Sequence, residues 1–158
     1  MARANDLLSA KIHELTMQLL AANDLHKTIA VIEEAMRSGF DADHAVLVLF
    51  GDPEAFEDIS AGRFFRAVKK NDPTLRPFGT FLGGTSARCG KIRDSQREFL
   101  FHGDADEIGS AALVPLGDGA EIGFLAVGSA DSDRFHPGMS IDFLTRLGDL
   151  VTESLKRF

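Results

Sequence analysis

The sequence predicts a single α+β domain, in which an antiparallel sheet is flanked by helices from the two ends of the chain. Three observations support this fold class. The chain of 158 residues, with 44% hydrophobic and 26% charged side chains, suits one core of ordinary globular composition. Long amphipathic helical patterns occur in residues 1–36 and 139–158. Between them, short apolar runs are separated by turn residues, without the regular strand–helix alternation of a parallel sheet.

The first helix is predicted over residues 1–22. Its positions spaced alternately by four and three residues are Met1, Asn5, Leu8, Ile12, Leu15, Leu19 and Ala22. This spacing is the a/d pattern of a short coiled coil, in which a polar Asn5 would fix the register. A helix that packs on its own domain is the alternative, which the apolar stripe favours because Leu7 and Leu20 widen it. We divide the chain into a connecting or dimerisation helix, 1–22, and a domain, 23–158.

A second helix and the first strand follow. Asn23 and Asp24 are good N-caps, and Gly39 suits the left-handed residue after a helix. The run HAVLVLF, residues 44–50, is short, apolar and bounded by turn residues on both sides. These features predict a central strand.

The middle of the chain is broken into loops by prolines 73 and 77 and by glycines 79, 83, 84 and 90. Within it, residues 54–60 could form a helical turn and 63–70 a strand or the end of a helix. Residues 95–101 are predicted to form a short helix.

The last third is predicted to form a hairpin and a helix. Two apolar runs, 110–116 and 122–128, are joined by Gly117-Asp118-Gly119, which is typical of a hairpin. We expect these strands and 44–50 to be adjacent and antiparallel in the middle of one sheet. A helix from about Met139 would present the apolar face Ile141, Leu144, Leu147, Val151 and Leu155, and its Gly148 would let another backbone approach closely.

Charge is distributed unevenly. The net charge is −7, which argues against a nucleic-acid partner. Residues 62–93 nevertheless carry eight basic side chains against Asp72 alone, a local balance of +7. This basic stretch has three interpretations: a solvated surface, a surface that neutralises the acidic flanks, or the lining of a pocket for an anionic small molecule.

Several chemistries are excluded by spacing. The stretch Gly84 to Lys91 has five residues between its glycines where a phosphate-binding P-loop needs four, and Ile92 follows where Ser or Thr is needed. The five histidines show no metal-ligand spacing. No run approaches the length of a membrane span, and no signal peptide is evident. We therefore expect a cytoplasmic protein without metal, cofactor or membrane contact.

Cys89 is the single cysteine and the one candidate nucleophile. Arg88 and Lys91 beside it, with Arg93 nearby, are expected to lower its thiol pKa and favour the thiolate. The alternative is an inert, buried thiol, which is common for a lone cysteine.

The segments DLHKTIAVIEEAMRSGFDADHAVLVLF, SAALVPLG, GFLAVGS and RFHPGMSIDFLTRLGDLV together resemble a GAF domain. More closely, RCGKIRDSQREFLF with SAALVPLG and RFHPG is similar to a bacterial GAF-like family catalogued as domain of unknown function 484, over roughly residues 5 to 158. The resemblance implies a six-stranded antiparallel sheet with the terminal helices on one side and a variable segment on the other. It also implies a ligand cavity under that segment and dimerisation through the terminal helices. The motifs of the cyclic-nucleotide, bilin and methionine-sulfoxide-reducing GAF types are absent.

We therefore expect a non-catalytic regulatory or sensor-type module, dimeric through its terminal helices, that binds a small anionic metabolite. The expected ligand-binding residues are Arg63, Arg88, Cys89, Arg93 and Arg97. Two alternatives stay open. One is a thiol-dependent small-molecule reductase centred on Cys89. The other is a ligand-free interaction scaffold with a closed core filled by phenylalanines, including Phe78, Phe81, Phe99 and Phe101.

Overall fold

The structure is a computed structural model that describes residues 2–39, 42–57, 59, 64–84, 86–101, 106–135 and 142–158. Among these described residues, five α-helices and five strands form the frame. The helices are α1 (Ala2–Ala21), α2 (Leu25–Glu34), α3 (Gly79–Leu82), α4 (Asp94–Phe101) and α5 (Asp142–Leu155). The strands are β1 (His44–Phe50), β2 (Phe65–Val68), β3 (Arg88–Gly90), β4 (Ser110–Leu116) and β5 (Gly123–Ser129). Short 3-10 helices occur at Pro53–Phe56, Pro73–Phe78 and Asp118–Ala120.

The sheet has the order β2-β1-β5-β4-β3. The predicted central trio is confirmed, because β1 pairs antiparallel with β5 and β5 antiparallel with β4. Five strands occur among the residues that the structure describes, so the expected number of about six is not confirmed. The expectation of a wholly antiparallel sheet is wrong, because β2 runs parallel to β1, with Leu47 opposite Phe65. The chain between Phe50 and Phe65 is long enough for the crossover that a parallel pair needs.

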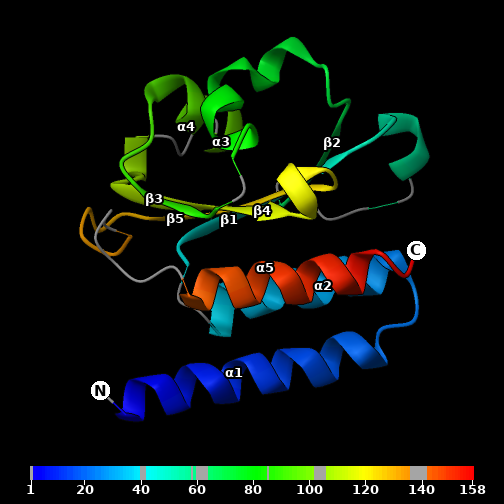
Figure 1. Cartoon of the computed structure of the whole chain (residues 1–158), viewed down its shortest axis with the longest axis vertical. Coiled ribbons are helices and arrows are strands. Elements are labelled where there is room, and N and C mark those ends of the chain that lie inside the picture. The colour runs from blue at the N-terminus through cyan, green and yellow to red at the C-terminus, as the bar shows by residue number, and fades with distance from the viewer. Residues whose placement is uncertain are drawn as a thin grey trace.

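The layers are visible in Figure 1. Helices α2 and α5 cover one face of the sheet, and α1 lies beyond them as a further layer. Helices α3 and α4 lie on the opposite face. The sheet is thus sandwiched between a layer of long helices and a layer of short ones.

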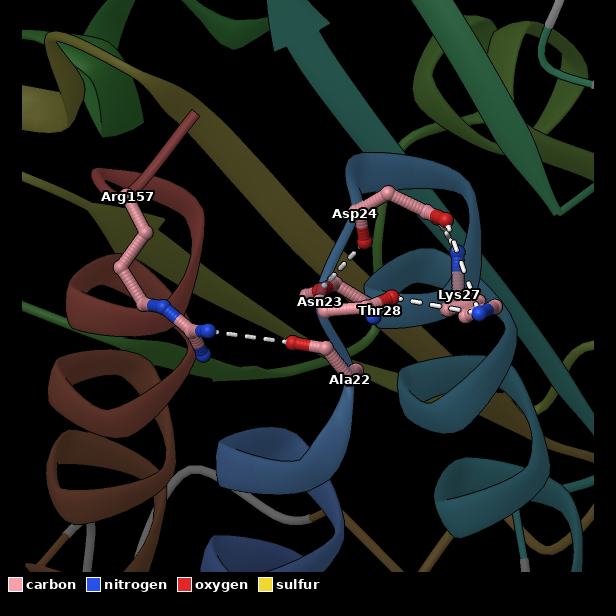
Figure 2. Close-up of polar contacts among 6 residues, drawn as sticks. All are labelled: Ala22, Asn23, Asp24, Lys27, Thr28 and Arg157. Carbon is pink, nitrogen blue, oxygen red and sulfur yellow. Dashed lines mark hydrogen bonds and ion pairs between the residues drawn. The ribbon is translucent and has the colours of Figure 1, made fainter.

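Helix α1 packs on its own chain. Leu15 and Leu19 are each 2% exposed and Ala22 is buried, so heptad positions already lie against the domain. Arg157 near the C-terminus donates to the carbonyl oxygen of Leu19 (2.9 Å), in the last turn of α1. It also donates to the carbonyl oxygen of Ala22 (3.1 Å), directly after α1, as Figure 2 shows. At Leu15, Leu19 and Ala22, the heptad positions are therefore covered within one chain.

Helix α2 begins as predicted but continues further. Asp24 is its N-cap: the Asp24 carboxylate accepts from the backbone N–H of Lys27 (2.7 Å), and Thr28 Oγ1 donates to the Asp24 carbonyl oxygen (2.9 Å). Figure 2 shows this turn. At its other end, α2 passes into a π-helical turn, Ala35–Gly39. The predicted helix end at Gly39 is therefore replaced by a wider turn that includes Gly39.

Helix α5 lies close to β4. Its buried face includes Leu144, Leu147, Val151 and Leu155, whereas Ile141 falls outside the described residues. A Cβ on Gly148 would lie 2.7 Å from Val114 Cγ1 and 3.2 Å from the Pro115 carbonyl oxygen. The predicted close approach at Gly148 is therefore confirmed.

Candidate functional site at the edge of the sheet

Phenylalanine rings fill the middle of the space between the sheet and the short helices. Phe124 of β5 and Phe78 are fully buried, with ring centroids 5.1 Å apart. Phe81 of α3 is also buried, and its ring lies edge-on to Phe124 at 5.6 Å. Such tilted and edge-to-face pairs are favourable and leave little space between the rings. The centre of this face is therefore filled, and space for a ligand remains only toward the edges of the sheet.

A cavity of about 450 Å³ opens at the edge formed by β3. Its apolar lining includes Phe81 of α3 and Ala111 and Leu113 of β4, all at least 97% buried. Its cationic lining consists of Arg88, Lys91 and Arg93, which the structure places at exposed positions. None of the described residues that line it is acidic. We call this space the β3-edge cavity.

Two of these cations are available to a ligand. Within the described part of the chain, neither Arg88 nor Lys91 forms an ion pair. An Arg88 terminal nitrogen lies 3.9 Å from where a Cβ on Gly84 would stand, so the side chain extends from β3 toward the end of α3. The Arg88 side chain therefore crosses one side of the cavity.

Arg93 has a mixed role, because it also holds the cavity wall together. Its backbone N–H donates to Gln96 Oε1 (3.0 Å), and its guanidinium donates to the Pro77 carbonyl oxygen (2.9 Å). Gln96 Nε2 donates to the same carbonyl (2.8 Å). The bond from the Arg93 N–H to the Gln96 side chain is a capping arrangement, because Arg93 directly precedes α4. These bonds join the start of α4 to the segment before α3, and leave part of the Arg93 guanidinium for other partners.

Arg97 lies in a neighbouring hollow of about 330 Å³, which shares Lys91 and Ile92 with the β3-edge cavity. Its guanidinium pairs with Asp94 and donates to the Ile108 carbonyl oxygen at 3.4 Å. Its Nε is buried without a hydrogen-bond partner among the described residues. Arg97 thus connects α4 to the segment before β4, beside the cavity proper.

Cys89 borders the cavity, but its side chain lies on the other face of the sheet. It pairs with Ala112, and both pack into the core under the long helices, whereas Arg88 pairs with Leu113 on the opposite face. This is the ordinary alternation of a strand. Burial raises the pKa of the Cys89 thiol, and the charge of Arg134 opposes this shift only in part. The expected lowering of the pKa by neighbouring basic residues is therefore wrong, because Arg88 next to it in sequence points away from it.

The predicted ligand-binding residues are thus divided. Arg88 and Arg93 line one cavity, Cys89 borders it, Arg97 lies beside it, and Arg63 is outside the described residues. The cavity wall that Thr80 and Gln96 provide was not predicted from the sequence. A signal for Gln96 existed, since glutamine three residues after a helix-capping position is a known capping pattern.

Another arginine, Arg66 of β2, is committed to the fold. Its guanidinium lies 5.1 Å from the centroid of the Phe99 ring and donates to the Phe99 carbonyl oxygen. Burial lowers the pKa of Arg66. This arginine joins the other edge of the sheet to α4 and lines no part of the β3-edge cavity.

A second hollow, of about 400 Å³, lies on the helix side between α5 and the β4–β5 turn. Its charged residues are Asp118, Asp149, Glu153 and Lys156, and Lys156 is already paired with Glu153 at 3.5 Å. The two cavities therefore differ in sign of charge, and the cationic one suits an anion.

No cluster of three or more metal-ligating side chains occurs among the residues that the structure describes. Over the same residues, no helix is both long enough and apolar enough to span a bilayer. The fold and the cavity define a class: an α+β module with a cation-lined cavity at one sheet edge. The chain belongs to the family described as Protein of unknown function, DUF484, whose model matches residues 1–158. A comparison with curated proteins gives no match.

Proposed function

We propose that this protein is a GAF-like, non-catalytic regulatory module that binds a small anionic metabolite in the β3-edge cavity. The observation that carries the proposal is the cavity lining. Arg88, Lys91 and Arg93 line one space without a carboxylate among its described lining residues, in a chain whose net charge is −7. An anion bound there would offset the mutual repulsion of these three cationic side chains.

The size and the residue types also support a ligand site. Small-molecule sites occupy about 300–1,000 Å³, and the cavity of about 450 Å³ falls within this range. An arginine such as Arg88 can bind a carboxylate or phosphate through two parallel hydrogen bonds.

The state of Cys89 favours binding over thiol chemistry. A reductase needs a thiolate that faces its substrate. The raised pKa of Cys89 favours the neutral thiol, and its side chain packs into the core on the far face of the sheet. Both observations weigh against the reductase alternative.

The ligand-free scaffold has one observation in its favour, the phenylalanine-filled centre. Phe78, Phe81 and Phe124 occupy the middle of the space under α3 and α4. If the protein is a scaffold, the β3-edge cavity holds only water.

We also propose that the protein is dimeric through its terminal helices. Because Leu15 and Leu19 are covered within one chain, the contact would use the outer surface, where Met17 is 56% exposed and Leu20 is 66% exposed. Sedimentation should show a dimer for the natural sequence and a monomer for Met17→Glu/Leu20→Glu, with unchanged helical content. A monomeric natural sequence would refute dimerisation.

Native mass spectrometry of freshly purified protein tests the ligand proposal. We expect a bound small anion whose occupancy falls in Arg88→Gln. Arg76→Gln is the matched control, since it removes the same charge from an exposed position outside the cavity. The ligand-free scaffold would instead give the bare protein mass, and no stabilisation of the protein by a panel of anionic metabolites.

A further inference from the structure

We infer that the β3-edge cavity takes a compact, polar dicarboxylate, a small molecule whose two carboxylates stand at separate ends of a short body. This inference rests on the proposed function and narrows it to one class of ligand. It follows from which lining residues are accessible and from where the cationic side chains are held.

The accessible lining of the cavity is polar. Its exposed residues are Thr80, Arg88, Lys91 and Arg93. Phe81, Ala111 and Leu113 are at most 3% exposed, because they already pack into the core. Since most of the apolar lining is already out of contact with water, a long alkyl chain or a large ring would gain little by binding there. The accessible groups instead suit a hydrophilic molecule.

The number of cations favours more than one anionic group. None of the described lining residues is acidic. The side chains of Arg88 and Lys91 have no ion-pair or hydrogen-bond partner among the described residues. The Arg93 guanidinium gives one donor to the Pro77 carbonyl oxygen (2.9 Å) and keeps the others. A monoanion would leave much of the repulsion among these three cations in place, and a dianion offsets more of it.

The three cations are held at different places on the cavity wall. Arg88 extends toward the end of α3, where one of its terminal nitrogens lies 3.9 Å from the position of a Cβ on Gly84. The Arg93 guanidinium is bonded to Pro77, which precedes α3. Lys91 lies where the cavity meets the neighbouring hollow, because it lines both spaces. Two carboxylates at separate ends of one molecule can therefore each reach a cation, whereas a single phosphate group concentrates its charge at one place.

The wall between the two arginines suits a short polar body. Thr80 lies in α3, between Pro77 and Gly84, and it is exposed and lines the cavity. Its hydroxyl group has no hydrogen-bond partner among the described residues. Because a hydroxyl group both donates and accepts hydrogen bonds, it can bind a carboxylate or a hydroxyl group of the ligand. The fork of an arginine matches a flat carboxylate at either end of such a body.

Isothermal titration calorimetry with four probes tests the inference: succinate, succinamate, inorganic phosphate and glucose 6-phosphate. Succinamate has the length of succinate but carries an amide in place of one carboxylate. The two phosphates carry their charge on a single group, one without and one with a polar body. We expect saturable binding of succinate, at least tenfold tighter than that of any other probe.

Two variants connect this binding to the cavity. Arg88→Gln and Lys91→Gln each remove an exposed cation whose side chain has no partner among the described residues, so both should fold like the natural sequence. Each variant loses one charge-assisted contact and should bind succinate about tenfold more weakly. Each should also show a smaller preference for succinate over succinamate. Arg76→Gln, at an exposed position outside the cavity, should bind like the natural sequence.

The possible failures separate this inference from the proposed function. Equal binding of succinate and succinamate, weakened in Arg88→Gln, would overturn the second carboxylate while the proposed function stands. Tighter binding of either phosphate than of succinate, again weakened in Arg88→Gln, would have the same consequence. If no probe binds, the inference fails, and the proposed function fails with it if the native protein also carries no anion in mass spectrometry. Succinate binding that is unchanged in both Arg88→Gln and Lys91→Gln would overturn both proposals.

Discussion

Replacing Gly148 with alanine should change stability with opposite sign in two backgrounds. Gly148 lies in α5, where it faces β4 of the sheet. In a helix that touched nothing, glycine to alanine would stabilise the protein by about 1 kcal/mol. Here the new Cβ would stand 2.7 Å from Val114 Cγ1, closer than carbon atoms approach. Because Val114 is 1% exposed, its side chain has little room to move.

The magnitude follows from these two opposed effects. Overpacking of a closed core costs about 1–3 kcal/mol, which outweighs the helix-propensity gain of about 1 kcal/mol. Gly148→Ala should therefore destabilise the natural sequence by about 1 kcal/mol. In a Val114→Ala background the conflicting methyl group is absent, and the remaining neighbour is the Pro115 carbonyl oxygen at 3.2 Å. There the same substitution should stabilise by up to about 1 kcal/mol.

Urea unfolding of the four proteins in this cycle, followed by circular dichroism, measures the coupling. We expect an interaction free energy near 2 kcal/mol, within the usual range of about 0.5–3 kcal/mol for residues in contact. Gly79→Ala is a control, because a Cβ there would meet nothing within 4 Å. Equal effects of Gly148→Ala in both backgrounds would refute the close approach of α5 to β4.

Three further outcomes are expected. Phe124→Ala should lower the free energy of unfolding by about 3–5 kcal/mol in urea denaturation. Phe158→Ala, at a 49% exposed position, should change it by less than about 0.5 kcal/mol. Similar losses for the two variants would contradict the aromatic core. Since burial raises the pKa of Cys89, its stabilising contribution is fully present below the unfolded thiol pKa of about 8.5 and is lost as pH rises through the folded pKa. The stability of the natural sequence should thus fall relative to Cys89→Ser in alkaline unfolding curves, and a constant difference would contradict the shift. Arg157→Ala should accelerate amide hydrogen exchange in the last turn of α1, whose carbonyls it binds; Lys156→Ala removes only an exposed ion pair and should not.

Much of the fold could be predicted from local patterns. The strands β1, β4 and β5 are short apolar runs with a glycine-bounded turn between the last two, and their antiparallel order follows from that punctuation. The cap at Asp24 and the close approach at Gly148 are also set by residue type. In each case the determining residues lie near one another in the sequence.

What could not be predicted depends on contacts between distant segments. The parallel pairing of β2 with β1 depends on where the crossover returns the chain, which no local pattern specifies. The heptad spacing of residues 1–22 shows which face of the helix is apolar, but it does not say what covers that face. In the structure, Leu15 and Leu19 on that face are buried against the rest of the same chain.

The candidate site could be predicted only in part, because its residues come from segments that are distant in the sequence. A basic stretch gives the sign of charge in the region, and Arg88 and Arg93 do meet in one cavity. Strand alternation, however, places Cys89 and Arg88 on opposite faces, although they are adjacent in sequence. The apolar lining comes from α3 and β4, and only the fold brings Phe81 and Leu113 together with the arginines.

The central claim is that the β3-edge cavity is the ligand site, and amide NMR shifts during titrations with a panel of small anionic metabolites test it most directly. We expect the largest changes in residues 80–81, 88–93 and 111–113, which surround the cavity. Residues around the acidic hollow, such as Gly117 and Thr152, should be unaffected. Changes centred on that acidic hollow, or no saturable change anywhere, would contradict the account.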